Sequence, residues 1–179
     1  AYDEISRILK WDIDAAVVSD SQLVQTIDQV YRRTEEITGL ARELEQDLGD
    51  SYVDFGALGA GLGAEDAPVV KLLQSVFEDA TQVGASDIHI EPTENRLAIR
   101  FRIDGALHLQ TEPDLKIAPA MALRLKLMSG LDISEKRLPQ DGRFNVRIRD
   151  QQVDVRISTM PTQYGESVVM RLLNRQSGL

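Results

Sequence analysis

Hydrophobic positions recur with different periods along the chain, and these periods predict its elements. Apolar residues three and four apart indicate helices at Glu4–Lys10 and at about 21–33, and a helical seam from 37 to 48 favours a short third helix. A short apolar run at Asp14–Ser19 has the length of a strand. Helix, strand and helix in so few residues cannot form a core, so we interpret residues 1–37 as the tail of a small α/β domain.

Residues 38–65 change in composition and predict a linker. The stretch is acidic at first and then rich in glycine, which makes the backbone flexible. The glycine spacing does not match a dinucleotide-binding fingerprint, and no clear strand precedes it. The glycines of this stretch are Gly56, Gly59, Gly61 and Gly63.

The rest of the chain, residues 66–179, alternates between helical and strand periods. Asp104-Gly105 between two alternating runs is a strong hairpin signal. The order α-β-β-β-α-β-β-β predicts an α+β domain of antiparallel hairpins. The expected helices run from Asp66 to about Gly84 and over Pro119–Gly130, and the strands over Ser86–Pro92, Arg96–Ile103, Ala106–Thr111, Arg143–Arg149, Gln152–Thr159 and Ser167–Leu173.

Charge divides the chain in the same way. Residues 1–65 carry 5 Lys and Arg against 14 Asp and Glu, whereas residues 66–179 carry 15 of each. The net charge of −9 disfavours general nucleic-acid binding. The absence of cysteine excludes disulfides, and no apolar run has the roughly 20 residues that cross a bilayer. The first residue is Ala1 and not Met, which suggests part of a longer protein.

Arginines follow the strands on the side opposite the apolar residues. Two interpretations stay open: a solvated face paired with nearby acids, or a face on which one or two arginines reach an anion on a neighbouring subunit or domain. Arg100 and Arg102 are the best candidates for the second, because they lie beside a rigid hairpin. The outward arginines are Arg96, Arg100, Arg102, Arg147, Arg149 and Arg156.

The stretch from Lys136 to Phe144 combines a predicted Asp141-Gly142 turn with arginines that a turn does not need. We expect it to position a ligand or to brace an interface. A glutamate before the last strand is expected to pair with one of its arginines across the sheet. The residues of this expected interface are Arg137, Gln140, Asp141, Arg143 and Glu166.

Other chemistry has weaker support. Asp87, His89 and Glu91 share one strand face, but this spacing favours a polar face over a metal site. The chain has no G-x-x-x-x-G-K-[ST] loop and no nucleophile elbow. We therefore expect no cofactor, no metal and no self-contained enzyme in this chain.

Four motifs in order give the chain a specific resemblance. They are Ser86-Asp-Ile-His-Ile-Glu-Pro92, Arg100-Phe-Arg-Ile-Asp-Gly105, Arg137-Leu-Pro-Gln-Asp-Gly-Arg143, and Ser158-Thr-Met-Pro161 with Gly165-Glu166. Over 66–179 they resemble the domain that precedes the motor in type II secretion and type IV pilus assembly ATPases. The residues of these motifs resemble most those of the mannose-sensitive haemagglutinin pilus branch. Residues 1–37 resemble the end of the family's amino-terminal domain more loosely.

The resemblance implies a PAS-like domain joined to a RecA-like motor that would begin after Leu179 and use ATP and Mg. It also implies a homo-hexamer in the cytoplasm, peripheral at the inner membrane, that moves a membrane platform protein. By motif position, Arg100 would approach nucleotide bound by a neighbouring motor, with Arg102 and Lys116 as helpers. Some relatives carry Arg near Lys116, and Lys cannot form the same planar fork. Some pilus-branch members bind cyclic di-GMP further upstream, but that motif is absent here.

Two functions from different classes therefore remain. The first is the regulatory and force-transmitting part of a hexameric assembly ATPase. The second is a PAS-like sensor module that binds a small anion or a nucleotide by itself.

Overall fold

The computed structural model describes residues 2–11, 13–31, 33–48, 68–148 and 151–174. The chain divides into two compact units, residues 1–32 and residues 33–179. The predicted glycine-rich part of the linker lies outside the described residues. No helix in the described ranges is long and apolar enough to cross a membrane.

The first unit contains α1 (Tyr2–Leu9) and α2 (Asp20–Tyr31). Ser19 caps α2, because its hydroxyl accepts from the Gln22 backbone amide at 3.3 Å while Gln22 Oε1 accepts from the Ser19 backbone amide at 3.1 Å. The predicted strand at Asp14–Ser19 is wrong: residues 13–19 form no strand. A strand needs a partner to satisfy its backbone groups, and this segment has none within the described residues of its unit.

The second unit is an α+β fold, which confirms the predicted class. It contains one antiparallel six-stranded sheet in the order β3-β2-β1-β6-β5-β4. The strands are β1 (Asp87–Pro92), β2 (Leu97–Ile103), β3 (Ala106–Thr111), β4 (Gln140–Ile148), β5 (Gln151–Thr162) and β6 (Gly165–Asn174). The helices are α3 (Thr34–Leu48), α5 (Pro68–Gln82) and α6 (Ala118–Met128), with a 3₁₀ turn, η1 (Leu115–Ile117).

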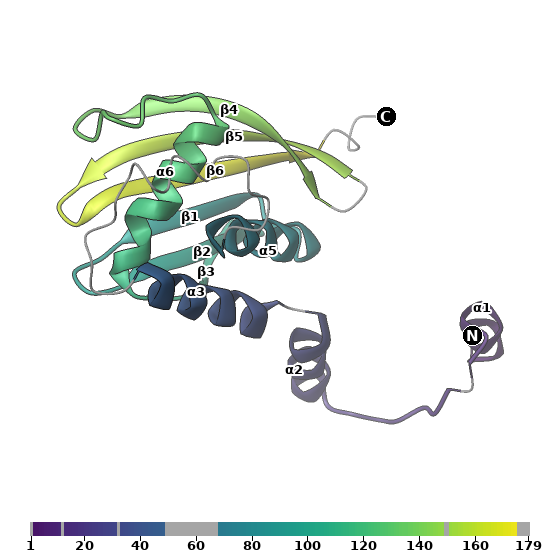
Figure 1. Ribbon diagram of the computed structural model, residues 1–179. Coiled ribbons are helices and arrows are strands. Elements are labelled where there is room, and N and C mark those ends of the chain that lie inside the picture. Colours follow the sequence, from purple (N-terminus) through teal and green to yellow (C-terminus); the bar gives the residue numbers. More distant parts are fainter. Residues whose placement is uncertain (1, 12, 32, 49–67, 149–150, 175–179) are drawn as a thin grey trace. The chain divides into compact units, whose positions relative to one another are not determined.

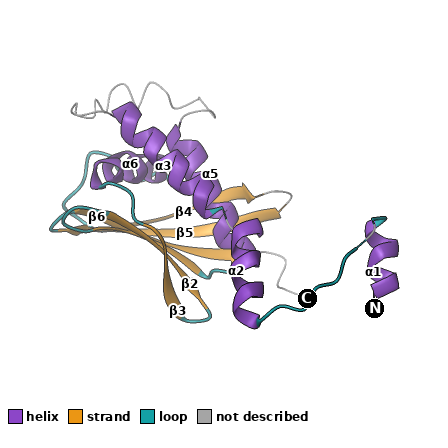
Figure 2. Ribbon diagram, turned by 90° about the horizontal axis from the view of Figure 1, so that it is seen from below, coloured by secondary structure: helices purple, strands orange, loops and turns teal. Residues whose placement is uncertain are grey.

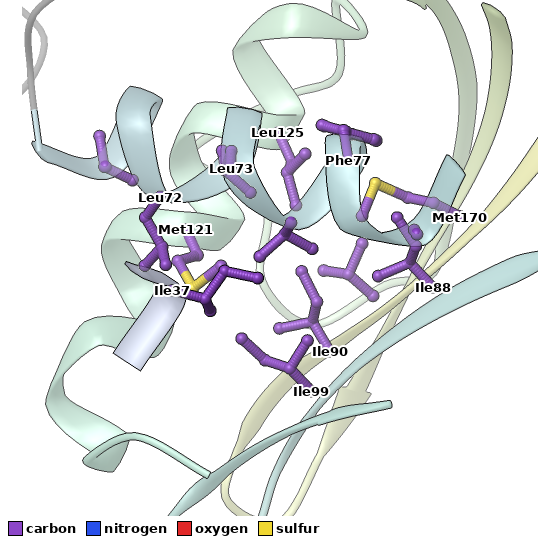
Figure 3. Packing of buried hydrophobic residues seen from close by; sticks show 14 of the residues in the cluster. Ile37, Leu72, Leu73, Phe77, Ile88, Ile90, Ile99, Met121, Leu125 and Met170 are labelled. Atoms are coloured by element: carbon purple, nitrogen blue, oxygen red, sulfur yellow. The ribbon is translucent and has the colours of Figure 1, made fainter. Parts of the chain in front are cut away.

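The three α-helices described in this unit lie on one face of the sheet (Figures 1 and 2). Apolar side chains from the helices and the sheet meet between these two layers (Figure 3). Phe77 of α5 contacts Phe144 of β4 edge to face, with ring centroids 6.0 Å apart. The opposite face of the sheet carries no helix from the described part of this unit.

Helix α3 belongs to this core, which corrects the predicted linker. Ile37, Ala41 and Leu44 are buried in the core cluster. Both ends of the helix are also tied down, since the Arg33 amide donates to Asp79 Oδ1 at 3.2 Å and Glu45 Oε1 accepts from the Asp114 amide at 2.8 Å. The acidic composition suggested a solvated linker, but α3 buries one apolar stripe and uses some of its acids as hydrogen-bond acceptors.

Candidate functional site

The helix-free face of the sheet presents its side chains in rows, because directly paired residues on antiparallel strands project from the same side. One row is Arg143, Arg156, Arg171, Asp87 and Arg102, read from β4 across β5, β6 and β1 to β2. The next row holds Asp141, Ser158, Val169, His89 and Arg100. The alternation predicted from sequence is confirmed over the described strands, and Arg100 and Arg102 lie on this face, which we call the outer face. Arg149, also predicted to point outward, lies outside the described residues.

Arg100 is held by a carboxylate on the adjacent strand. Its Nη1 donates to Glu91 Oε2, and the Arg100 side chain is 36% exposed. The other carboxylate oxygen of Glu91 lies 3.4 Å from His89 Nδ1. This contact uses one edge of the guanidinium group, so the remaining N–H groups of Arg100 can bind an anion.

Asp87 is the carboxylate shared by two arginines. Its Oδ1 accepts from Arg171 Nε at 3.0 Å, and its Oδ2 lies 3.7 Å from Arg102 Nε and accepts from the Ser86 hydroxyl at 2.7 Å. Burial raises the pKa of Asp87, but the hydrogen bonds from Ser86 and Arg171, with the positive charge of Arg171, outweigh burial and lower the pKa overall. Asp87 is therefore ionised at neutral pH and orients both guanidinium groups.

The β2–β3 hairpin fixes the position of Arg102. Asp104 and Gly105 both have positive φ, 49° and 83°, as the predicted two-residue turn requires. Arg102 Nη1 donates to the Gly105 carbonyl at 2.9 Å, across the base of this turn. Arg102 is therefore held by its own hairpin as well as by Asp87.

Lys116 lies elsewhere in the unit. It is exposed on η1, which packs against α3 and α6 on the helix-covered side. Asp114 caps this turn by accepting from the Lys116 amide at 2.9 Å. The sheet register that unites Arg100 and Arg102 does not include Lys116.

The loop before β4 differs from the prediction. Asp141-Gly142 is not a turn, because both residues lie within β4 and pair with Ser158 and Ile157 of β5. A side chain at Gly142 would place its Cβ 2.9 Å from Leu131 Cδ2, so this glycine permits a close approach of the preceding loop. Asp141 and Gly142 are residues typical of turns, but here strand pairing with β5 and packing against Leu131 place them in a strand.

Gln140 braces the loop from within the chain. Its Oε1 accepts from the Asp132 amide at 2.9 Å, and its Nε2 donates to the Asp132 carbonyl at 2.9 Å. Arg137, by contrast, is 89% exposed, with its amide donating to Glu135 Oε1 at 2.6 Å and its Nε 3.6 Å from the same oxygen. Gln140 thus has a structural role, whereas the Arg137 side chain extends toward solvent.

Glu166 pairs with a lysine and not with an arginine, which corrects the predicted cross-sheet pair. Glu166 Oε2 lies 2.6 Å from Lys126 Nζ of α6, and the lysine side chain is 1% exposed. Lys126 also donates to the Glu135 carbonyl at 2.6 Å. The pair therefore joins α6, the loop before β4 and the start of β6. Sequence analysis missed it, since Lys126 has no distinguishing local pattern.

No group of three or more His, Asp or Glu residues within the described ranges is arranged to hold a metal ion. Asp87, His89 and Glu91 share a strand face as predicted, but their carboxylates contact Arg171, Arg102 and Arg100. The arrangement is an arginine–carboxylate network.

Comparison with known proteins shows which family the chain belongs to. Residues 63–178 match the family model described as "Type II/IV secretion system protein". The chain belongs to this family. It is 41% identical to the "Type II secretion system ATPase E" of Vibrio cholerae, over 97% of this chain and 36% of that protein. The corresponding protein E of Aeromonas hydrophila is 47% identical over the same shares.

A pilus protein is also similar. The "Type IV pilus assembly ATPase PilB" of Pseudomonas aeruginosa is 38% identical over 92% of this chain and 30% of that protein. The chain therefore spans about a third of the length of these relatives. Among solved structures, the pilus retraction motor PilT with bound ADP aligns with 58% of this chain and 29% of its own, at a TM-score of 0.39 and 19% identity. The family resemblance is confirmed, and the assignment to one pilus branch stays a prediction.

Proposed function

We propose that this chain is the regulatory and force-transmitting part of a hexameric ATPase that powers pilus assembly or type II secretion. In this proposal the second unit is a PAS-like domain, and a RecA-like motor in the parent protein binds ATP and Mg. The parent works in the cytoplasm at the inner membrane, where it moves a platform protein. The family match and the names of the relatives support this class of machine.

The observation that supports the mechanism is how Arg100 and Arg102 are exposed and held. Both are partly exposed on the outer face, and each is oriented by a carboxylate that leaves part of its guanidinium group free. Guanidinium groups held in this way can stabilise the charge that develops on a phosphoryl group during transfer. Arg100, with Arg102 beside it, would serve nucleotide bound by a neighbouring motor domain.

The loop residues have a separate place in the proposal. Arg137, Asp141 and Arg143 are exposed, and they would contact the neighbouring domain while Gln140 keeps the loop in position. Glu166 would contribute indirectly, through its pair with Lys126. Lys116 would at most approach the nucleotide from another side, because it lies on η1.

The test uses the parent protein with its motor. Arg100→Ala should lower kcat for ATP hydrolysis by about 10³-fold, in the lower range for arginines of this type, with little change in nucleotide affinity. Arg147→Ala is the matched control, since it removes the same charge from the outer face of β4. Equal turnover in Arg100→Ala and Arg147→Ala would refute a role for Arg100 in the reaction.

A further inference from the structure

Strand β3 is an edge of the sheet, because among the described strands it pairs with β2 alone. Its residues Ala106–Leu109 are all exposed, and two of them are large and apolar: Leu107 is 42% exposed and Leu109 is 54% exposed. Both leucines lie on the outer face, because they pair with Arg102 and Arg100. Single exposed leucines are ordinary, but two at alternate positions on an unpaired edge form a template for another strand.

The unpaired backbone groups of this edge belong to the same two leucines. The two-residue turn at Asp104-Gly105 closes the β2–β3 hairpin with a hydrogen-bonded pair. Hydrogen-bonded and non-hydrogen-bonded pairs alternate along an antiparallel ladder, so Leu107 and Leu109 both fall in non-hydrogen-bonded pairs with β2. Their N–H and C=O groups therefore point away from β2, toward the free edge.

The free stretch of the edge ends at Gln110. The pairing register shifts at this residue, which forms a bulge in β3. Gln110 is buried, and its Nε2 donates to Asp79 Oδ2 at 3.0 Å and to Thr34 Oγ1 at 3.2 Å. Thr34 is the first residue of α3, and this helix runs from there toward Asp114. It therefore leaves Ala106–Leu109 uncovered, which agrees with their exposure.

The other edge strand is protected from pairing in a way that β3 is not. On β4, the exposed residues include Asp141, Arg143 and Arg147, and charges on an edge disfavour pairing with a further strand. In contrast, β3 contains no Lys, Arg, Asp, Glu or Pro. A second copy of β3 would therefore meet neither a like charge nor a proline across the ladder.

We propose that the free edge of β3 pairs with the same edge of a second copy of this chain, in an antiparallel ladder centred on His108. In this register Leu107 forms a hydrogen-bonded pair with Leu109 of the second copy, and the reverse pair forms by symmetry. The free backbone groups of both edges are then satisfied together, and the leucines of both copies meet on the outer face. The two His108 side chains lie directly opposite each other on the other face.

The symmetry of this register is what favours a second copy as the occupant. Each leucine provides both a donor and an acceptor at the position where its counterpart needs them, and the apolar side chains match in the same way. A two-fold contact is also different in kind from the heterologous contacts that close a ring. The inference therefore does not rest on the proposed function.

Sedimentation velocity of the 179-residue chain between about 10 µM and about 1 mM tests the contact. The ladder is much shorter than a standard interface, so we expect a weak dimer, with half of the chains paired at about 100 µM. His108→Lys and His108→Glu each place like charges opposite each other and should weaken the dimer about fivefold, whereas an equimolar mixture of the two variants should associate at least as well as the unchanged chain. Asn145→Lys is the matched control, because it places the same charge on the exposed side of β4, and it should change the affinity less than about twofold.

Amide hydrogen exchange followed by NMR provides an independent readout, because backbone pairing protects amides and a contact between side chains alone does not. The Leu107 and Leu109 amides should exchange about fourfold more slowly at about 1 mM than at about 20 µM, in proportion to the loss of monomer. A chain that stays monomeric at about 1 mM, a mixture of the two His108 variants that does not associate, or an equal effect of Asn145→Lys overturns the proposal. Equal protection of both amides at every concentration overturns it too, since the chain itself would then cover the edge.

Discussion

Replacing Glu166 with Gln tests the buried Lys126–Glu166 pair, which joins α6 to the start of β6. The substitution keeps the size of the side chain but removes the charge that lies 2.6 Å from Lys126 Nζ. The lysine side chain is 1% exposed, so its charge would then face only neutral acceptors here, such as the Glu135 carbonyl, in place of the Glu166 carboxylate. Leaving a buried charge uncompensated destabilises a protein by about 3–5 kcal/mol.

Glu166 is itself 10% exposed, so we expect the lower end of that range, about 3 kcal/mol. A domain of this size loses about 2–4 °C in Tm per kcal/mol, which corresponds to a decrease of about 6–12 °C. Urea unfolding followed by circular dichroism measures the free energy directly. Glu94→Gln, at an exposed position, is the control for the change in net charge and should lie within about 0.5 kcal/mol of the unchanged chain.

A double variant separates the contribution of the ion pair to stability from the contributions of its two members. Lys126→Met with Glu166→Leu removes both charges and should regain most of the stability, because an apolar replacement of a buried ion pair is often neutral or favourable. A loss below about 1 kcal/mol in Glu166→Gln, or a double variant as unstable as the sum of the single changes, would refute the reasoning.

Two further predictions concern stability. Leu44→Ala should cost about 2–5 kcal/mol in urea unfolding, because Leu44 is buried in α3, whereas a residue in a linker would cost almost nothing. Asp87→Asn should destabilise the chain at pH 7. The folded-state pKa of Asp87 is lowered, so its contribution is present above the ordinary value of 3.8 and is lost as pH falls through the lowered pKa. Unfolding measured from pH 7 to pH 2.5 should show that the difference in unfolding free energy between the unchanged chain and Asp87→Asn becomes smaller in acid. A difference that stays constant with pH would contradict the ionic role of Asp87.

Local periodicity was enough to predict the strands of the second unit, the β2–β3 hairpin and the outward side of Arg100 and Arg102. It could not predict that α3 is part of the core, because acidic composition hides the stripe formed by Ile37, Ala41 and Leu44. It also could not give the strand order. The β1–β6 pairing alone brings Arg171 to Asp87, and these residues are 84 positions apart in sequence.

From the sequence, the site could be predicted only for residues that lie on one strand or its adjoining turn. Arg100 and Arg102 were found because they alternate with apolar residues next to a strong turn signal. Asp141-Gly142 was misread because a dipeptide typical of turns also suits a strand where Leu131 packs against the backbone. The Lys126–Glu166 pair depends on packing between α6 and β6, for which the local sequence holds no signal.

The central claim, that Arg100 acts on a nucleotide bound by another subunit, is tested most directly by mixing two inactive variants of the parent protein. One carries Arg100→Ala with an intact motor, and the other has an intact Arg100 with a motor that cannot hydrolyse ATP. In a ring of heterologous contacts, about a quarter of the interfaces then combine an intact motor with an intact Arg100. The account predicts that ATPase activity returns on mixing to about that fraction of the unaltered level. Mixed rings that stay as inactive as either variant alone would contradict it.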